Sequence, residues 1–109
     1  EDGDTPAHIA AGNGQTAALE LLVEAGCDVN QSNEDGDTPA HGAAGNGQTA
    51  ALELLVEAGC DVNRANEDGD TPAHGAAGNG QTAALELLVE AGCNVNQADE
   101  RGATPAYVA

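Results

Sequence analysis

Apolar and polar residues follow one pattern along this chain, and the pattern returns every 33 residues. In the middle copy, an acidic stretch at 34–37 precedes an alanine-rich stretch at 39–46 and a leucine-rich stretch at 49–58. Leu52 and Leu55 fall on one side of a helix drawn through the leucine-rich stretch. The pattern therefore predicts a turn, two short antiparallel helices and a loop in each copy.

Local signals predict where the helices of the middle copy begin and end. Thr38 is the expected N-cap of the first helix, and Pro39 is its expected first residue, where the missing N–H costs nothing. Gly59 is the expected left-handed residue after the second helix. Gly36 lets the acidic turn adopt a positive φ, and Val62 is the expected inward anchor of the loop.

The copies are nearly identical. Over their first 30 residues, the first and second copies differ only at Ile9 and Gly42, and the second and third only at Asp61 and Asn94. Such identity indicates a recent duplication or a deliberately built, consensus-like repeat protein. One unit of such an array cannot bury its own apolar face. We therefore expect one domain over 1–109, with repeats at about 1–33, 34–66 and 67–99 and a partial repeat at 100–109.

Several positions of the middle copy match a known repeat pattern: Gly36, Thr38-Pro39-Ala40-His41, Ala43-Ala44, Gly47, Leu55, Gly59 and Asp61-Val62-Asn63. With these residues and its length, the unit resembles the ankyrin repeat over essentially the whole chain. The resemblance implies an all-α, ankyrin-repeat solenoid of stacked helix-turn-helix units with hairpin-like tips. It also implies a non-catalytic protein-interaction module, whose tips and first helices form the concave binding side.

The positions that contact targets in the ankyrin family are acidic residues, glycine and asparagine in this chain. Interface hot spots favour Trp, Tyr and Arg, and the repeated part of this surface offers none of them. The set suits a basic or periodic protein partner, or an engineered scaffold with no partner. The candidate partner-binding residues are Glu34, Asp35, Asp37, Gly45, Asn46, Glu67, Asp68, Asp70, Gly78 and Asn79.

Two departures from the family pattern concern the first helix. Ala40 stands where the family usually has Leu, and Gly42 stands where an apolar residue is common. Replacing a buried Leu by Ala typically costs about 2–5 kcal/mol, and Gly inside a helix costs about 1 kcal/mol more. We therefore expect the first helix to be the weak element of each unit.

The charge of the chain narrows the class of partner. Nineteen acidic residues and two basic ones give a formal net charge of -17, which argues against nucleic-acid phosphates and anionic membranes as partners. No segment approaches the roughly 18 apolar residues of a membrane span, so we expect no membrane partner. A natural version of the chain would be cytoplasmic, which free thiols would fit.

Three histidines and three cysteines each occupy one position of the repeat. Stacked helices lie about 8–10 Å apart, whereas zinc binds histidine nitrogen at about 2 Å and a disulfide needs Cα atoms within about 7 Å. We therefore expect no metal centre, disulfide, catalytic residue or cofactor. The resemblance implies that each histidine bonds to backbone between neighbouring units. The residues are His8, His41, His74, Cys27, Cys60 and Cys93.

Two further patterns of the sequence are candidate binding motifs. The stretch 45–50 imitates a dinucleotide fingerprint, but that fingerprint requires a preceding strand, so we interpret the stretch as a helix–helix turn. Glu34, Asp35 and Asp37 place three carboxylates on one tip, and a row of tips could hold Ca²⁺ or Mg²⁺ weakly. Gly42 stands where an EF-hand would need its bidentate Glu. Cation binding therefore stays the alternative to protein binding.

The ends of the array predict one more partner. Leu85, Leu88 and Val89 of the last complete helix pair are followed by no further second helix in the sequence. A solenoid end that exposes apolar surface invites a second end of matching shape. We therefore expect end-to-end self-association at high protein concentration, opposed by the negative charge at low salt.

Overall fold

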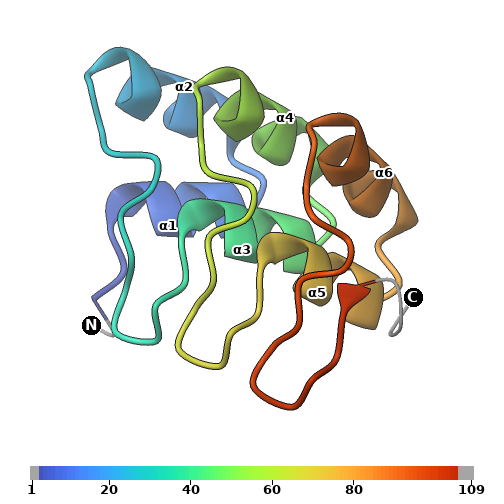
Figure 1. Ribbon diagram of the computed structural model, residues 1–109. Coiled ribbons are helices and arrows are strands. Elements are labelled where there is room, and N and C mark those ends of the chain that lie inside the picture. The colour runs from blue at the N-terminus through green and yellow to red at the C-terminus, as the bar shows by residue number, and fades with distance from the viewer. Residues whose placement is uncertain (1–2, 106–109) are drawn as a thin grey trace.

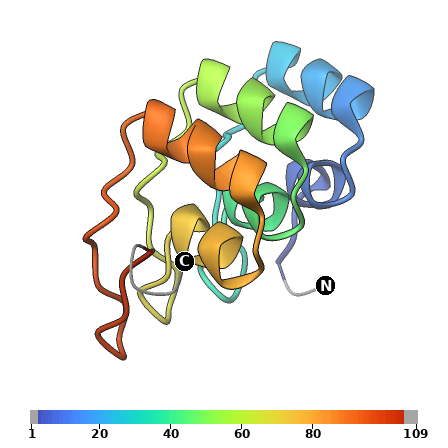
Figure 2. The same cartoon turned by 90° about the vertical axis from the view of Figure 1, so that its right-hand side faces the viewer.

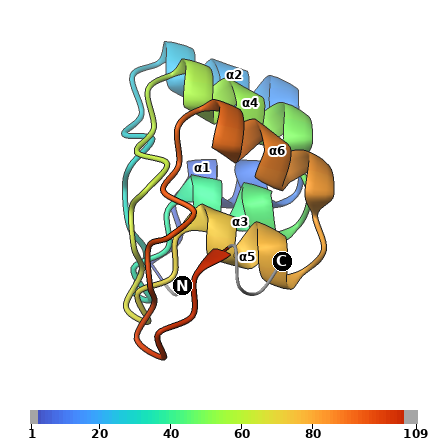
Figure 3. The same ribbon diagram turned by 45° about the vertical axis from the view of Figure 1, so that its right-hand side comes forward.

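The computed structural model describes residues 3–105, and all regular secondary structure within that range is helical. The first helices of the units form one layer and the second helices form the other (Figures 1 and 3). The first layer holds α1 (Pro6–Gly12), α3 (Pro39–Gly45) and α5 (Pro72–Gly78), and the second holds α2 (Thr16–Glu24), α4 (Thr49–Glu57) and α6 (Thr82–Glu90). Because α3 contacts α1 and α5, and α4 contacts α2 and α6, the units stack in chain order. The predicted all-α solenoid is confirmed.

The helix ends follow the local signals in the sequence. Thr38 is extended (φ -99°, ψ 169°), and Pro39 begins α3, which is capped at its other end by Asn46. After α4 and its capping residue Ala58, Gly59 adopts a φ of 91°. The predicted ends of the two helices of the middle unit are therefore confirmed to within about one residue.

The loops that connect successive units end in tips that project beyond the first-helix layer, away from the second-helix layer (Figure 2). Gly36 lies at such a tip with a φ of 80°. A Cβ on Gly36 would lie only 2.8 Å from the backbone nitrogen of Glu67 on the next tip. Glycine is therefore required here both by the backbone conformation and by the close approach of the neighbouring tip. Residues 1–2, and 106–109 of the expected partial repeat, lie outside the described range.

The core consists of alanine and leucine side chains between the two layers. Leu19, Leu52, Leu55 and Leu88 are 0% exposed, and Val62 packs against this cluster as a half-buried side chain. Each leucine buries less apolar area than an aromatic side chain would. The core therefore depends on many small contacts repeated along the stack.

The small residues of the first helices allow close packing between units. Ala40 is completely buried, and a Cβ on Gly42 would lie 3.6 Å from the Cα of Gly12 in the preceding unit. The backbones of α1 and α3 thus approach each other where the family usually has bulkier residues. A Cβ at this distance would make an ordinary van der Waals contact, so the expectation that these positions weaken the first helix stays a prediction.

Polar side chains also tie each unit to its neighbour. The Asn46 amide donates to the carbonyl oxygen of Gly12 at 2.9 Å, and the Gln48 amide donates to the same oxygen at 3.3 Å. On the loop side, the side-chain oxygen of Asn30 accepts from the Asp61 N–H at 2.7 Å. The equivalent bonds recur between the second and third units. These side chains thereby give backbone groups of one unit a hydrogen-bond partner in the neighbouring unit.

Candidate functional site

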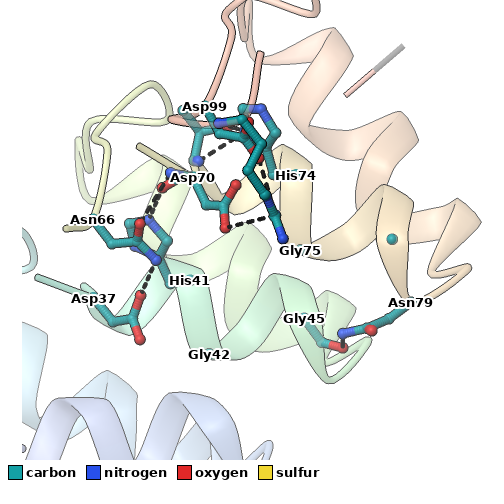
Figure 4. A pocket seen from close by; sticks show the side chains of 13 residues that line it. Asp37, His41, Gly42, Gly45, Asn66, Asp70, His74, Gly75, Asn79 and Asp99 are labelled. Carbon is teal, nitrogen blue, oxygen red and sulfur yellow. Dashed lines mark hydrogen bonds and ion pairs between the residues drawn. The ribbon is translucent and has the colours of Figure 1, made fainter. Parts of the chain in front are cut away.

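A groove lies between the tips and the first-helix layer. It contains a hollow of about 370 Å³ between α1 and α3 and one of about 320 Å³ between α3 and α5. Asp37 and Gly42 line both hollows, so the two are adjacent. The sides of the groove carry carboxylates and amides, and its base carries glycines (Figure 4).

In each unit, the aspartate directly before the threonine that caps the first helix lies in this groove. These residues are Asp4, Asp37 and Asp70. The Asn33 amide donates to Asp4 Oδ1 at 2.8 Å, and the Asn66 amide donates to Asp37 Oδ1 at 2.8 Å. The groove therefore presents acidic side chains at the period of the repeat, and amides of the following tips hold the first two in place.

The same asparagines shape the tips. Asn66 Oδ1 accepts from the backbone N–H groups of Asp68 and Asp70 at 2.9 Å each, and Asn33 does the same for the preceding tip. One side chain thus closes its own tip through its oxygen and reaches the preceding unit through its nitrogen. This double use explains why an amide occupies the position.

The third tip differs at this position. Asp99 replaces the asparagine, and its Oδ1 still accepts from the backbone N–H groups of Arg101 and Ala103 at 2.9 Å each. A carboxylate has no N–H to donate to Asp70, and Asp70 Oδ1 is buried without a hydrogen-bond partner among the described residues. Arg101 compensates from the tip, with its guanidinium 3.1 Å from Asp99 Oδ2 and 3.9 Å from Asp70 Oδ2.

Asp70 and Asp99 meet where the third tip contacts the preceding one, a contact called here the third tip joint. The pKa values of these two carboxyl groups are shifted in opposite directions. Burial, and then the neighbouring Asp99 carboxylate, raise the pKa of Asp70 above its usual value. Burial would also raise the pKa of Asp99, but the Ala103 N–H and the Arg101 guanidinium outweigh it, so that the pKa of Asp99 lies well below its usual value. Asp70 is therefore the first of the two carboxyl groups to take up a proton as the pH falls.

Asp70, His74 and Asp99 bring three potential ligand atoms within 4.8 Å of one another. Both nitrogens of His74 already have partners, because Nδ1 accepts from the Thr71 N–H at 2.9 Å and Nε2 lies 2.9 Å from the Ala103 carbonyl oxygen. With Asp99 also paired to an arginine, the donor set is already satisfied by protein groups, apart from one oxygen of Asp70.

The histidines link neighbouring units, as the resemblance implied. In the middle unit, His41 Nδ1 accepts from the Thr38 N–H at 2.9 Å, so Nε2 carries the proton and donates to the Asp70 carbonyl at 2.8 Å. Burial lowers the pKa of His41 from its ordinary value. The neutral ring is the form that satisfies both bonds, and His8 makes the equivalent contacts with Thr5 and Asp37.

The cysteines lie between the second helices and the loops as half-buried free thiols. Burial raises the pKa of Cys60 to about 11 and raises the pKa of Cys93. Both thiols therefore stay protonated at neutral pH and are poor nucleophiles.

The structure separates the predicted partner-binding residues into two groups. Six of them line the groove, whereas the other four are exposed on the tips outside the hollows. Sequence reasoning missed Asn33, Asn66, Asp99 and Arg101, although the changes at 99 and 101 are visible as breaks in the repeat. The groove residues are Asp37, Gly45, Asn46, Asp70, Gly78 and Asn79, and the tip residues are Glu34, Asp35, Glu67 and Asp68.

Stacked helix pairs with a groove between projecting tips and first helices define a helical-repeat solenoid. A family model described as ankyrin repeats (3 copies) matches residues 1–66, and another described as ankyrin repeats (many copies) matches residues 55–109. The chain therefore belongs to the ankyrin-repeat family. No curated protein matches it significantly.

Membership in this family gives the general function. Ankyrin repeats are protein-interaction modules, typically without catalysis, and protein partners follow from that class. Within the described range, the helices are too short to cross a bilayer.

Proposed function

We propose that the groove binds an extended, basic segment of a partner protein. The row of carboxylates formed by Asp4, Asp37 and Asp70 supports this proposal, because it places acidic groups at the period of the repeat along two adjacent hollows. Stacked units are spaced about 8–10 Å apart, and an extended chain rises about 3.3 Å per residue. A lysine or arginine at every third position of the partner would therefore meet successive carboxylates.

The composition of the groove supports modest, salt-sensitive binding. Asp37 and Asp70 are half-exposed, so ion pairs to them are screened by salt. The glycines at the base give a partner backbone room to approach, but they add little apolar area. The exposed acids at the tips, Glu34 and Glu67 among them, add long-range attraction that speeds encounter with a basic segment.

A peptide with lysine at every third position tests the proposal directly. Its dissociation constant is measured by fluorescence anisotropy at low and physiological salt, beside a peptide of the same composition with its lysines in one block. The groove variant Asp37→Asn/Asp70→Asn keeps an oxygen acceptor for the Asn66 amide. Its matched control, Glu53→Gln/Glu86→Gln, removes the same charge from exposed sites on the second helices.

We expect the spaced peptide to bind more tightly than the blocked one, and the groove variant to lose binding while the control keeps it. Equal weakening by both variants would mean that net charge alone attracts the peptide. Absence of binding at low salt would instead favour a scaffold without a partner. If Ca²⁺ raises the melting temperature and a chelator reverses the effect, the cation alternative is supported. The row of carboxylates could then no longer be assigned to peptide binding alone.

A further inference from the structure

The third tip brings a positive charge into the acidic groove. Arg101 stands where the two preceding tips have Asp35 and Asp68, and all three side chains are exposed. Arg101 lines the hollow between α3 and α5, beside Asp70 and Asp99. The charge that a partner meets at the third tip joint therefore differs from the charge that it meets at the joints before it.

Arg101 is the most exposed of the three charged groups at this joint. The side chains of Arg101, Asp70 and Asp99 are 78%, 26% and 1% exposed. Asp99 anchors the guanidinium, because one guanidinium nitrogen lies 3.1 Å from Asp99 Oδ2. The same nitrogen lies 3.9 Å from Asp70 Oδ2. A partner that approaches Asp70 from solvent therefore finds a positive charge already beside the carboxylate.

The second tip joint, where Asn66 meets Asp37, leaves its carboxylate open. The Asn66 amide donates to Asp37 Oδ1 at 2.8 Å (Figure 4), and Asp37 Oδ2 has no bonded partner among residues 3–105. Asp68, the equivalent of Arg101, adds a second negative charge to this joint. Asp4 is held in the same way, by the Asn33 amide at 2.8 Å. A basic side chain is therefore attracted at these two positions without meeting a competing cation.

We propose that Arg101 occupies the place of a partner's basic side chain at the third carboxylate of the groove. Basic side chains of the partner then bind at Asp4 and Asp37 and are rejected at Asp70. A second cation beside Asp70 would be repelled by the guanidinium about as strongly as the carboxylate attracts it, since both energies depend on distance in the same way. This selectivity rests on the peptide binding proposed above, and it gives the groove two unlike ends.

Arginine is well suited to this permanent place. Its guanidinium keeps its charge at every accessible pH, and its planar fork can contact two carboxylates at once. The Arg101 N–H also donates to Asp99 Oδ1 at 2.9 Å, so the arginine and its anchor belong to the same closed tip. Exposed ion pairs contribute little to stability. Arg101 can therefore be removed to open the third position while the fold is kept.

Three variants that each make the net charge more negative by the same amount test this selectivity. Arg101→Gln removes the guanidinium from the groove. Arg64→Gln is the matched control, because Arg64 is exposed on the loop between α4 and α5 and glutamine stands at the equivalent positions 31 and 97. Asp99→Asn/Arg101→Asp gives the third joint the residues of the second, Asn66 and Asp68. This double variant keeps the test valid should Arg101→Gln unfold, which helical circular dichroism checks.

Two peptides of ten residues measure what the third position accepts. Both carry lysine at their fourth and seventh residues, and the first and last residues are both glutamine in one peptide and both lysine in the other. Varying the two ends together makes the result independent of the direction in which the peptide lies. Fluorescence anisotropy at low salt gives the dissociation constant of each peptide for each protein. The ratio of the two constants for one protein measures the contribution of the outer lysines.

We expect the outer lysines to contribute about threefold to tenfold more affinity in Arg101→Gln and in the double variant than in the wild type and Arg64→Gln. That range corresponds to the gain of one exposed ion pair together with the loss of a nearby like charge. Adding Asp70→Asn to Arg101→Gln should remove the extra contribution, because Asp70 is the carboxylate that becomes available.

The possible failures point to different errors. Equal ratios in all the proteins, with measurable binding of both peptides, would show that Arg101 does not block a binding position and would leave the proposed peptide binding standing. An equal increase in Arg64→Gln would attribute the effect to net charge, and an increase that survives Asp70→Asn would place the added lysine elsewhere. If neither peptide binds any of the proteins at low salt, the proposed function itself is wrong and this selectivity falls with it.

Discussion

The second tip joint, where Asn66 meets Asp37, and the third, where Asp99 meets Asp70, have the same backbone arrangement but differ in charge. At the second, the Asn66 amide donates to Asp37 at 2.8 Å. At the third, Asp99 occupies the place of that asparagine and faces Asp70 carboxylate to carboxylate. Both residues close their own tips with the same pair of backbone hydrogen bonds. A repeat can therefore keep its shape through one atom of a side chain and change its interface through another.

Arg101 is the second half of this difference. It stands where the preceding tip has Asp68, and its guanidinium approaches both carboxylates of the third joint. The pair Asp99 and Arg101 thus replaces one neutral amide contact by a charged network. Such a network stabilises an interface only when every buried group in it is satisfied, and Asp70 Oδ1 is not.

The largest expected effect comes from copying the third joint onto the second without its arginine. Asn66→Asp keeps the oxygen that closes the tip but removes the donor to Asp37 and adds a like charge. We expect a loss of about 1.5–3 kcal/mol in the free energy of unfolding, the usual range for a hydrogen bond to a charged group. Urea denaturation measures it. Adding Asp68→Arg should recover part of the loss, and failure of this second change to help would show that Arg101 does not compensate Asp99.

The reverse change should stabilise the chain. Asp99→Asn restores the amide donor, removes the like charge beside Asp70 and keeps the oxygen that closes the third tip. We expect the melting temperature at neutral pH to rise by about 4–8 °C, the shift that one ordinary hydrogen bond gives a domain of this size. Glu100→Gln is the matched control, because it removes the same charge from an exposed neighbour. An equal rise in both variants would attribute the effect to net charge.

The pH dependence of that gain follows from the shifted carboxyl groups. Because the folded pKa of Asp70 is raised, the folded wild type binds a proton before the unfolded chain does, so its third joint gains stability as pH falls toward about 4. Below that value the lowered pKa of Asp99 reverses the trend, since the unfolded chain then takes up the proton first. The advantage of Asp99→Asn should therefore shrink between neutral pH and about pH 4. Thermal melts of both proteins across this range measure it, and a constant or widening gap would contradict the assignment.

The sequence predicted the helices well because each is bounded by residues with strong local preferences. Thr38 and Pro39 begin α3, and Gly59 follows α4, as expected from capping chemistry alone. The position of the groove and the role of the histidines came from the family resemblance. The residues that indicate these features recur at equivalent positions in every unit, so each unit supports the same prediction.

The tip joints could not be predicted in the same way. Nothing in the sequence singled out Asn66, because its partner Asp37 lies 29 residues earlier in the chain and no local signal connects the two. Asp68 and Asp70 were predicted alike as partner-binding residues, yet Asp70 is partly buried in the groove whereas Asp68 is exposed. The letters at 99 and 101 already break the period, but their meaning depends on which residue of the preceding unit they meet.

The smallest effect is expected from removing Arg101 alone. Its side chain is 78% exposed, and its distance to Asp70 Oδ2 is 3.9 Å, so solvent and salt screen the attraction. We expect Arg101→Gln to shift the melting temperature by no more than about 2 °C, which is typical of an exposed ion pair. The shift should vanish at high salt and in the Asp99→Asn background, where Arg101 no longer has two carboxylates to bridge. A large loss that persists in salt would show instead that Arg101 holds the third tip in place, and that the charged joint is as tightly built as the amide joints before it.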